Sequence, residues 1–304
     1  MDKQELIQNI QRLKAEKDAL IVAHYYVDGD VQAIADYVGD SYYLSKVCMD
    51  NPQKVIVFCG VKFMGESAKI MNPEKTIMMA APAADCPMAH MADVDKIENM
   101  RKQYDDLAVV CYINSTAEIK AHSDVIVTSS NALNIVSKLT NKNIFFIPDE
   151  HLGRYIAEKL PEKNFIFNDG YCHVHTSIHA EDVIKAKEAR PNAEILVHPE
   201  CPTEIVELAN YVGSTSGILD YATKSDSQEF IICTEIGIFY ELEQKNPNKK
   251  FYSVGRRQFC PNMKLISLEN VLSALENIDE GVQVDENIAR KAKHALSRMH
   301  ELGN

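Results

Sequence analysis

Three cysteines recur along the chain at nearly one interval, each after a short apolar stretch and a polar turn. Cys86, Cys172 and Cys260 lie 86 and 88 residues apart. Three thiolates that converge on one point can bind a metal, either as a zinc ion with a fourth ligand or as an iron–sulfur cluster with one iron left open as a Lewis acid. The spacing therefore predicts that these three cysteines are metal ligands.

The other cysteines have a different setting. Cys48, Cys59, Cys111 and Cys233 stand inside apolar runs or helical stretches, where cysteine is typically a small buried side chain. Cys201 lies in HPECP, and for it too we favour burial over ligation. Because we expect a reducing compartment, none of the eight cysteines is expected to form a disulfide.

Pairs of polar residues recur with the same interval, each at the end of an apolar run. In chain order the pairs are His24 and Tyr26, Tyr112 and Asn114, and His198 and Glu200. The i, i+2 spacing at a strand end points both side chains of a pair the same way. Glu200, beside His198, is the best candidate for general acid–base catalysis, joined by Tyr26 and His24. His175, in CHVH, is expected to face the same cavity.

A third series consists of hydroxyl residues that begin helical stretches. Ser41, Ser129 and Thr215 each stand seventeen residues after the first member of a pair. Such a residue caps a helix, and the free N–H groups of a helix start also bind anions. Capping alone would explain one site, whereas three favour a cavity for a small molecule with carboxylate or phosphate groups. The chain has neither a Walker motif nor G-x-G-x-x-G, so nucleotide binding has no support.

The elements that must position these residues follow from the alternation of apolar runs with helical stretches through the whole chain. This alternation predicts an α/β fold with parallel sheets covered on both faces, and functional residues beyond the carboxyl ends of the strands. The shared interval indicates a triplicated chain. Units of about 85 residues are small for independent domains, so we expect three similar parallel-sheet α/β domains in a pseudo-threefold arrangement around a central active site.

The expected boundaries follow the repeat. We predict an N-terminal helix over residues 1–19 that packs on the body, α/β repeats over 20–105, 106–191 and 192–277, and a C-terminal helix within 278–304. Residues 31–38 are expected to be helical.

Composition restricts the class of protein. The net charge of −12 argues against a nucleic-acid partner, which would need a basic face. No apolar run approaches the length that spans a bilayer, and the charged N-terminus has no signal-peptide core, so we expect a cytoplasmic protein without a membrane partner.

Taken together and in order, the motifs closely resemble the quinolinate synthase A family, the iron–sulfur enzymes of bacterial and archaeal de novo NAD biosynthesis. The matching motifs are HYY (24–26), GDS (39–41), CPMAHM (86–91), YINS (112–115), TSSNA (128–132), PDEHLGRY (148–155), CHVH (172–175), HPECP (198–202), GSTSG (213–217) and CPNMK (260–264). They cover nearly the whole chain. The family's fold is a triangle of three similar α/β domains, which agrees with the repeat.

The resemblance implies one [4Fe-4S] cluster per chain, held by Cys86, Cys172 and Cys260, with the fourth iron left for substrate. It implies condensation of iminosuccinate (iminoaspartate) with dihydroxyacetone phosphate to quinolinate, with loss of phosphate and two waters. Tyr26 and Glu200 match the family's acid–base residues. The expected substrate-binding residues are His24, Ser41, Tyr112, Asn114, Ser129, His175, His198, Glu200 and Thr215. Some members carry further cysteines near the third ligand; this chain has only Cys260 there, so a regulatory disulfide is not expected.

Two other functions remain open at this point. One is a mononuclear zinc or iron hydro-lyase that uses the same three cysteines, and the other is a non-catalytic metabolite sensor. The aspartate-oxidising enzyme that supplies iminosuccinate is the expected transient partner. Arg256 and Arg257 fit either a solvated turn or an anion clamp, and Lys224 is given no role.

Overall fold

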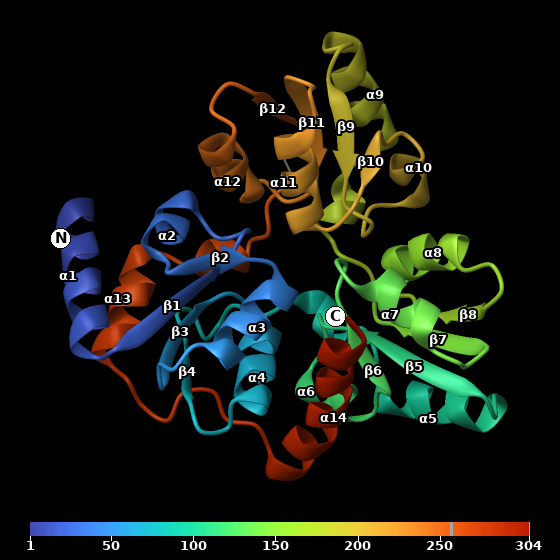
Figure 1. The fold of residues 1–304 in the computed structure, drawn as a ribbon, viewed down its shortest axis with the longest axis horizontal. Helices are drawn as coiled ribbons and strands as arrows, with labels where there is room; N and C mark the ends of the chain where they lie inside the picture. The colour runs from blue at the N-terminus through green and yellow to red at the C-terminus, as the bar shows by residue number, and fades with distance from the viewer. Residues whose placement is uncertain (256–257, 304) are drawn as a thin grey trace.

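The computed structural model describes residues 1–255 and 258–303, and within them the strands form three parallel four-stranded sheets around a common centre (Figure 1). The first sheet has the order β2-β1-β3-β4, with strands Tyr37–Gly39, Ala19–His24, Val55–Cys59 and Thr76–Met79. The second has the order β6-β5-β7-β8, with strands Val125–Val127, Leu107–Tyr112, Asn143–Ile147 and Asn164–Phe167. The third has the order β10-β9-β11-β12, with strands Tyr211–Val212, Glu194–Val197, Glu229–Cys233 and Lys250–Ser253. One topology repeated three times confirms the predicted fold class.

The strand register repeats as well. Val22 pairs with Tyr37 in the first sheet, Val110 with Val125 in the second, and Leu196 with Tyr211 in the third. The central strands β1 and β5 therefore end at equivalent positions, and β9 ends one residue before His198. Parallel strands place their carboxyl ends at one edge of a sheet, so the recurring polar pairs all lie at the edge that faces the centre.

Residues 31–38 do not form one helix, so that prediction is wrong. Helix α2 covers Gly29–Ile34, and Tyr37–Gly39 is the edge strand β2. Asp36 is the cause: its N–H donates to the Ile21 carbonyl at 2.8 Å, and its carboxylate accepts the Ile21 N–H at 2.9 Å. This double contact docks the chain beside β1 before a second helical turn can continue.

The same contact recurs in the other two units. Asp124 makes it with Val109, and Asn210 makes it with Ile195. Each of these residues directly precedes the short edge strand of its sheet. This paired contact between a side chain and the neighbouring strand is therefore a property of the repeat and not of one loop.

Helices cover each sheet. Those of the first unit are α2, α3 (Ser41–Asp50) and α4 (Lys62–Met71); those of the second are α6 (Ala117–Ala121), α7 (Ala132–Lys138) and α8 (Glu150–Lys159); those of the third are α10 (Thr203–Val206), α11 (Thr215–Lys224) and α12 (Ile238–Lys245). The two central strands of each sheet are almost entirely buried. Phe58, Phe145 and Phe230 are at most 2% exposed, and burying each aromatic side chain contributes roughly 2–3 kcal/mol.

Three further helices follow the cysteines and tie the units into a ring. Helix α5 (Val94–Gln103) packs against β5, α9 (Ala180–Ala189) against β11, and α13 (Leu268–Glu276) against β3. Each thus covers the sheet of the next unit, and α13 returns the chain to the first sheet. There it packs on α1 (Lys3–Glu16), as expected of an N-terminal helix on the body (Figure 1).

The last helix, α14 (Glu286–Gly303), crosses from the first unit to the second (Figure 1). It packs on α4 of the first unit and on α6, β6 and α7 of the second, with Ala292, Ala295, Leu296 and Met299 buried. No helix in the described part of the chain is long and apolar enough to cross a membrane. The division into repeats at residues 105, 191 and 277 stays a prediction, and Arg256 and Arg257 lie outside the described residues.

Candidate active site

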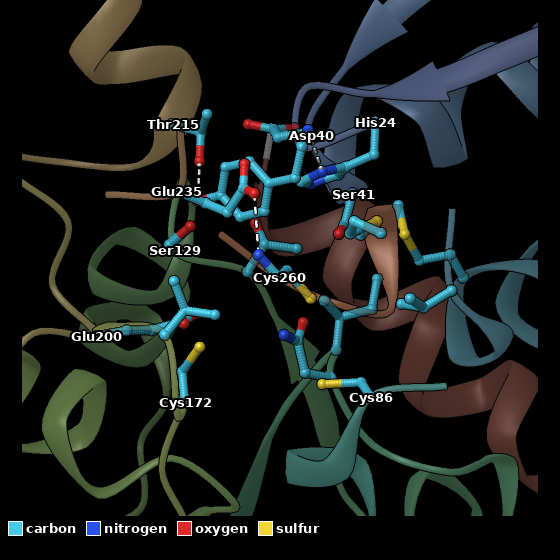
Figure 2. Close-up of a pocket in the computed structure, with 18 of the residues that line it drawn as sticks. His24, Asp40, Ser41, Cys86, Ser129, Cys172, Glu200, Thr215, Glu235 and Cys260 are labelled. Atoms are coloured by element: carbon cyan, nitrogen blue, oxygen red, sulfur yellow. Dashed lines mark hydrogen bonds between the residues drawn. The ribbon is translucent and has the colours of Figure 1, made fainter. Parts of the chain in front are cut away.

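One cavity at the meeting of the three units collects the residues singled out in the sequence (Figure 2). The predicted residues that line it are His24, Tyr26, Ser41, Cys86, Tyr112, Asn114, Ser129, Cys172, His175, His198, Glu200, Thr215 and Cys260. Every predicted site residue is therefore present. Asp40, Thr128 and Glu235 also line the cavity and were not predicted.

Each predicted ligand cysteine lies between the last strand of its unit and a short 3₁₀ turn. The turns are η1 (Pro87–His90), η2 (His175–Ser177) and η3 (Met263–Leu265). The chain folds back over each cysteine, whose carbonyl accepts an N–H from Ala89, Thr176 or Lys264 at 3.0–3.1 Å. Figure 2 shows the three sulfur atoms directed toward the same central space. The three loops thus present their thiols alike.

The environment of the three thiols disfavours free thiolates. Burial raises the pKa of Cys86 to about 12, with a contribution from Cys260. Burial also raises the pKa of Cys172, and Glu200 and Cys86 add to the shift. The thiols influence one another, and their ionised forms become favourable only when a cation compensates the charge.

The spacing of the three sulfurs favours a group larger than one ion. A tetrahedral zinc ion with Zn–S bonds of about 2.3 Å holds its sulfurs roughly 3.8 Å apart. Among the residues that the structure describes, the three cysteines do not form a set with all ligand atoms within 4.8 Å. At least two of the sulfurs therefore lie more than 4.8 Å apart, wider than one tetrahedral zinc ion holds its sulfurs, which counts against the mononuclear hydro-lyase.

The other cysteines are buried away from the cavity, as predicted. Cys201 is 1% exposed, and its Sγ lies 3.5 Å from the carbonyl oxygen of Cys233 within an apolar cluster of the third unit. Cys48, Cys59 and Cys111 lie in the main hydrophobic core.

Glu200 is the buried charge at the centre of the site. The Tyr112 hydroxyl donates a hydrogen bond to Oε1, and His175 Nδ1 lies 2.8 Å from Oε2. Burial alone would raise the pKa of Glu200, but the close contact with His175 and the hydrogen bond from Tyr112 outweigh it. The pKa of Glu200 lies well below its usual range, so the group is a carboxylate at neutral pH.

His24 and His198 are neutral donors. Burial lowers the pKa of His24 to about 4 and that of His198 to about 3, although Glu200 opposes both shifts. In each ring Nδ1 accepts the N–H of the residue two positions on, Tyr26 at 3.1 Å and Glu200 at 3.3 Å. With Nδ1 accepting, the neutral ring carries its proton on Nε2, which can donate to a bound oxygen.

A chain of short contacts joins Tyr26 to Glu200. Tyr26 Oη lies 2.9 Å from Thr234 Oγ1, Thr234 Oγ1 lies 2.9 Å from His175 Nε2, and His175 Nδ1 meets Glu200. Burial, with a contribution from Glu200, raises the pKa of Tyr26 well above its usual range, so the phenol stays protonated. Thr234 was missed in the sequence, although it directly follows Cys233 at the end of β11. The chain can pass a proton between Glu200 and Tyr26.

The hydroxyl series does not cap its helices, so that expectation is wrong. Asp40 caps α3 through Tyr43 N–H at 2.9 Å, and Ser214 caps α11 through Gly217 N–H at 3.1 Å. Ser41 and Thr215 are the first residues of these helices. Because the preceding residue makes the cap, their hydroxyls remain for the cavity, and Thr215 Oγ1 lies 2.8 Å from Tyr26 Oη.

In the second unit, α7 starts at Ala132, so Ser129 lies outside the helix. It still lines the cavity beside Thr128.

Comparison with known proteins identifies close relatives. A family model described as quinolinate synthetase A protein matches residues 8–301. The chain is 53% identical over 302 residues to the quinolinate synthase of Clostridioides difficile, covering 99% of both chains. It is 52% identical to that of Caldicellulosiruptor bescii, covering 98% of this chain and 99% of the relative. For that of Fusobacterium nucleatum the identity is 54%, covering 96% of this chain and 98% of the relative.

Proposed function

This chain belongs to the quinolinate synthetase A family, and we propose that its central cavity condenses iminosuccinate with dihydroxyacetone phosphate to quinolinate, with loss of phosphate and two waters. The protein is a quinolinate synthase, an enzyme of NAD biosynthesis. The observation that carries the assignment of the site is the convergence of three periodic cysteines and three periodic polar pairs on one cavity.

We propose that Cys86, Cys172 and Cys260 hold one [4Fe-4S] cluster. Support comes from their similar placement before three 3₁₀ turns and from at least one sulfur–sulfur spacing wider than 4.8 Å. When bound, such a cluster offers an open iron that acts as a Lewis acid on a substrate oxygen. Thiols with raised pKa values would release protons on binding it.

Substrate binding is assigned to the walls of the cavity. Both substrates are anions, and the N-terminal ends of α3 and α11, with Ser41 and Thr215, offer free N–H and hydroxyl donors to carboxylate or phosphate oxygens. His24 and His198 would donate from Nε2 without carrying a charge. The remaining polar contacts are assigned to Tyr112, Asn114 and Ser129.

Proton transfer is assigned to the chain between Glu200 and Tyr26. As a carboxylate, Glu200 can accept a proton from a substrate carbon or nitrogen. As a protonated phenol, Tyr26 can donate one to a leaving oxygen. Thr234 and His175 would then return the proton from Glu200 to Tyr26, so the site regains its starting form within one turnover.

The test is turnover together with metal analysis of anaerobically prepared protein. We expect quinolinate to form from dihydroxyacetone phosphate and freshly generated iminosuccinate, in protein with about four iron and four labile sulfide per chain. Stoichiometric zinc without sulfide would overturn the cluster, and a full cluster without quinolinate would overturn the assigned reaction.

Iminosuccinate is an imine and hydrolyses in water, which favours rapid delivery. We therefore propose a transient encounter with the aspartate-oxidising enzyme that forms it. The cytoplasm is the proposed location, because a thiolate-held cluster needs reducing surroundings.

A further inference from the structure

A second set of metal-binding atoms lies inside the cavity and overlaps the proposed cluster site at one residue. Cys172, His175 and Glu200 each offer one ligand atom, and these three atoms all lie within 4.8 Å of one another. His175 and Glu200 are 1% and 3% exposed. In the described part of the chain this is the one set of three or more such residues with that spacing.

The ring of His175 is oriented as that of a metal-binding histidine typically is, and Nδ1 is the nitrogen that would bind the metal. It is buried and lies 2.8 Å from Glu200 Oε2, so the nitrogen and the oxygen that would bind an ion are already side by side. The opposite nitrogen, Nε2, is held by Thr234 Oγ1 at 2.9 Å. A ligating histidine usually has its second nitrogen fixed in this way, which orients the ring and selects the tautomer.

Glu200 also has one oxygen held by a hydrogen bond and the other directed toward the proposed metal position. The Tyr112 hydroxyl holds Oε1, which leaves Oε2 on the side of His175. Ligating carboxylates are typically hydrogen-bonded through their other oxygen. Both the histidine and the carboxylate thus already have the outer contacts that a bound metal would require.

We propose that the protein, while it lacks its cluster, binds one Zn²⁺ ion through Cys172, His175 and Glu200. A sulfur, an imidazole nitrogen and a carboxylate oxygen, with a fourth position open to water, make a donor set that suits zinc. On binding, the Cys172 thiol loses its proton to solvent and a Zn–S bond forms, with no change of oxidation state. The ion also compensates the buried charge of Glu200.

The site has a consequence that rests on the proposed function. The cluster and the zinc ion both need Cys172, so they exclude each other. Zinc binds such donor sets more tightly than ferrous iron does. Zinc bound here also occupies Glu200 and His175, so the zinc form is inactive and must lose its metal before a cluster can be assembled.

The test measures metal binding by full-length, cluster-free protein with Co²⁺ as a spectroscopic probe and Zn²⁺ as the competitor. We expect one ion per chain and a thiolate-to-cobalt absorption band. Cys172→Ser and His175→Ala should weaken Zn²⁺ binding by more than the roughly 10- to 100-fold that loss of an outer-shell partner costs. Cys86→Ser and Cys260→Ser should bind Zn²⁺ as the parent protein does.

The matched cysteine variants decide the outcome. Equal loss in all three would place zinc on the three cysteines and overturn the proposal, and no loss in Cys172→Ser or His175→Ala would mean an adventitious ion. Thr234→Val removes the contacts to His175 Nε2 and to Tyr26 Oη but no metal ligand. It should weaken binding about tenfold and serves if a ligand variant does not fold. Failure of the proposed function looks different, because the parent would then lack iron and sulfide, or would hold a full cluster and form no quinolinate, whatever the zinc pattern.

Competition provides a second measurement. Protein loaded with one equivalent of Zn²⁺ should take up iron and sulfide at least tenfold more slowly than metal-free protein, and a chelator should restore the rate. Uptake at the metal-free rate would overturn the proposed exclusion.

Discussion

The ammonium group of Lys264 donates to the main-chain carbonyl of Tyr26 at 2.9 Å, and so links the loop of Cys260 to the proposed acid of the first unit. Lys264 Nζ also lies 3.6 Å from Glu235 Oε1, which accepts the Cys260 N–H at 3.0 Å. Glu235 is fully buried. The lysine therefore balances a buried carboxylate and fixes the position of Tyr26 relative to the Cys260 loop.

We predict that Lys264→Met lowers turnover about tenfold with little change in KM or iron content. Tyr26 loses a main-chain restraint, while the Cys260 loop keeps its contact with Glu235. Stability should fall by about 3–5 kcal/mol, because the buried carboxylate of Glu235 loses the cation that balances its charge. The measurement is kcat and KM with iron determined in the same sample.

Lys224→Met is the matched control for Lys264→Met. Lys224 pairs with Asp220 at 3.7 Å, but both side chains are more than two-thirds exposed. An exposed pair contributes little to stability, so turnover and stability should stay at parent values. If Lys264→Met changes only the melting temperature and leaves kcat intact, the lysine is structural and does not position Tyr26.

The cysteines form two groups that respond differently to replacement by serine. Cys86→Ser, Cys172→Ser and Cys260→Ser should each abolish iron and sulfide binding. Cys59→Ser, Cys201→Ser and Cys233→Ser should keep the full cluster and lose about 1–3 kcal/mol of stability, because each buries a hydroxyl in an apolar site. Iron and sulfide assays with urea unfolding separate the two effects. Loss of the cluster in Cys201→Ser would contradict the ligand assignment.

Two adjacent hydroxyls of the third unit separate capping from substrate binding. Ser214→Ala removes the cap of α11 and should cost about 1 kcal/mol with KM nearly unchanged. Thr215→Val keeps the shape of the side chain and the cap, and should raise KM with little loss of stability. The two variants are compared by thermal unfolding and steady-state kinetics. The reverse pattern would return Thr215 to a structural role.

The repeat in the sequence was enough to predict the sheets, the ring of units and most of the polar residues that line the cavity, because each depends on residues placed at one interval. The prediction of one helix over residues 31–38 was wrong because their apolar pattern suits a helix. The contact that ends the helix joins Asp36 to Ile21, fifteen residues earlier in the chain, and a local pattern does not reveal it. The sequence did hold a sign of this contact, because Asp124 and Asn210 stand at the positions equivalent to Asp36 in the other two units.

Glu235 and Thr234 could not be predicted in the same way. The first unit has no counterpart of either type, since Gly60 and Val61 stand after Cys59, and the second unit matches only Glu235, with Asp149. Their roles arise from contacts between units, with Lys264, Cys260 and His175, and a periodic pattern within one chain does not encode such contacts.

The two neutral histidines make stability depend on pH. Burial lowers the pKa of His24 to about 4, while an unfolded histidine titrates near 6.5. Between these values the unfolded chain binds more protons, so stability falls as the pH drops from 6.5 toward 4. For His24 the expected loss from pH 7 to pH 5 is about 2 kcal/mol.

Urea unfolding of the cluster-free protein at both pH values measures this loss. His24→Asn keeps an acceptor for the Tyr26 N–H but cannot titrate, so it should lose less stability on acidification than the parent. His294→Asn changes an exposed histidine and should follow the parent. If the slope with pH is the same in His24→Asn and the parent, His24 is not the group that titrates.

Glu200→Gln separates catalysis from binding at the centre of the site. The amide keeps the size of the side chain, its oxygen can still accept the Tyr112 hydroxyl, and its N–H₂ can donate to His175 Nδ1. Packing, substrate binding and the cluster should therefore survive. What is lost is the carboxylate, the one group of the proton chain that is negatively charged at neutral pH. We expect quinolinate formation to fall by roughly 10²-fold or more, the usual scale of general acid–base catalysis. Turnover, iron content and binding of a substrate-like dicarboxylate are measured in the same preparation.

Thr234→Val is the control, because it interrupts the contacts between Tyr26 and His175 but leaves the Glu200 carboxylate in place. It should lose less activity than Glu200→Gln. Near-parental turnover of Glu200→Gln with a full cluster would make Glu200 a binding residue and leave Tyr26 as the leading catalytic candidate.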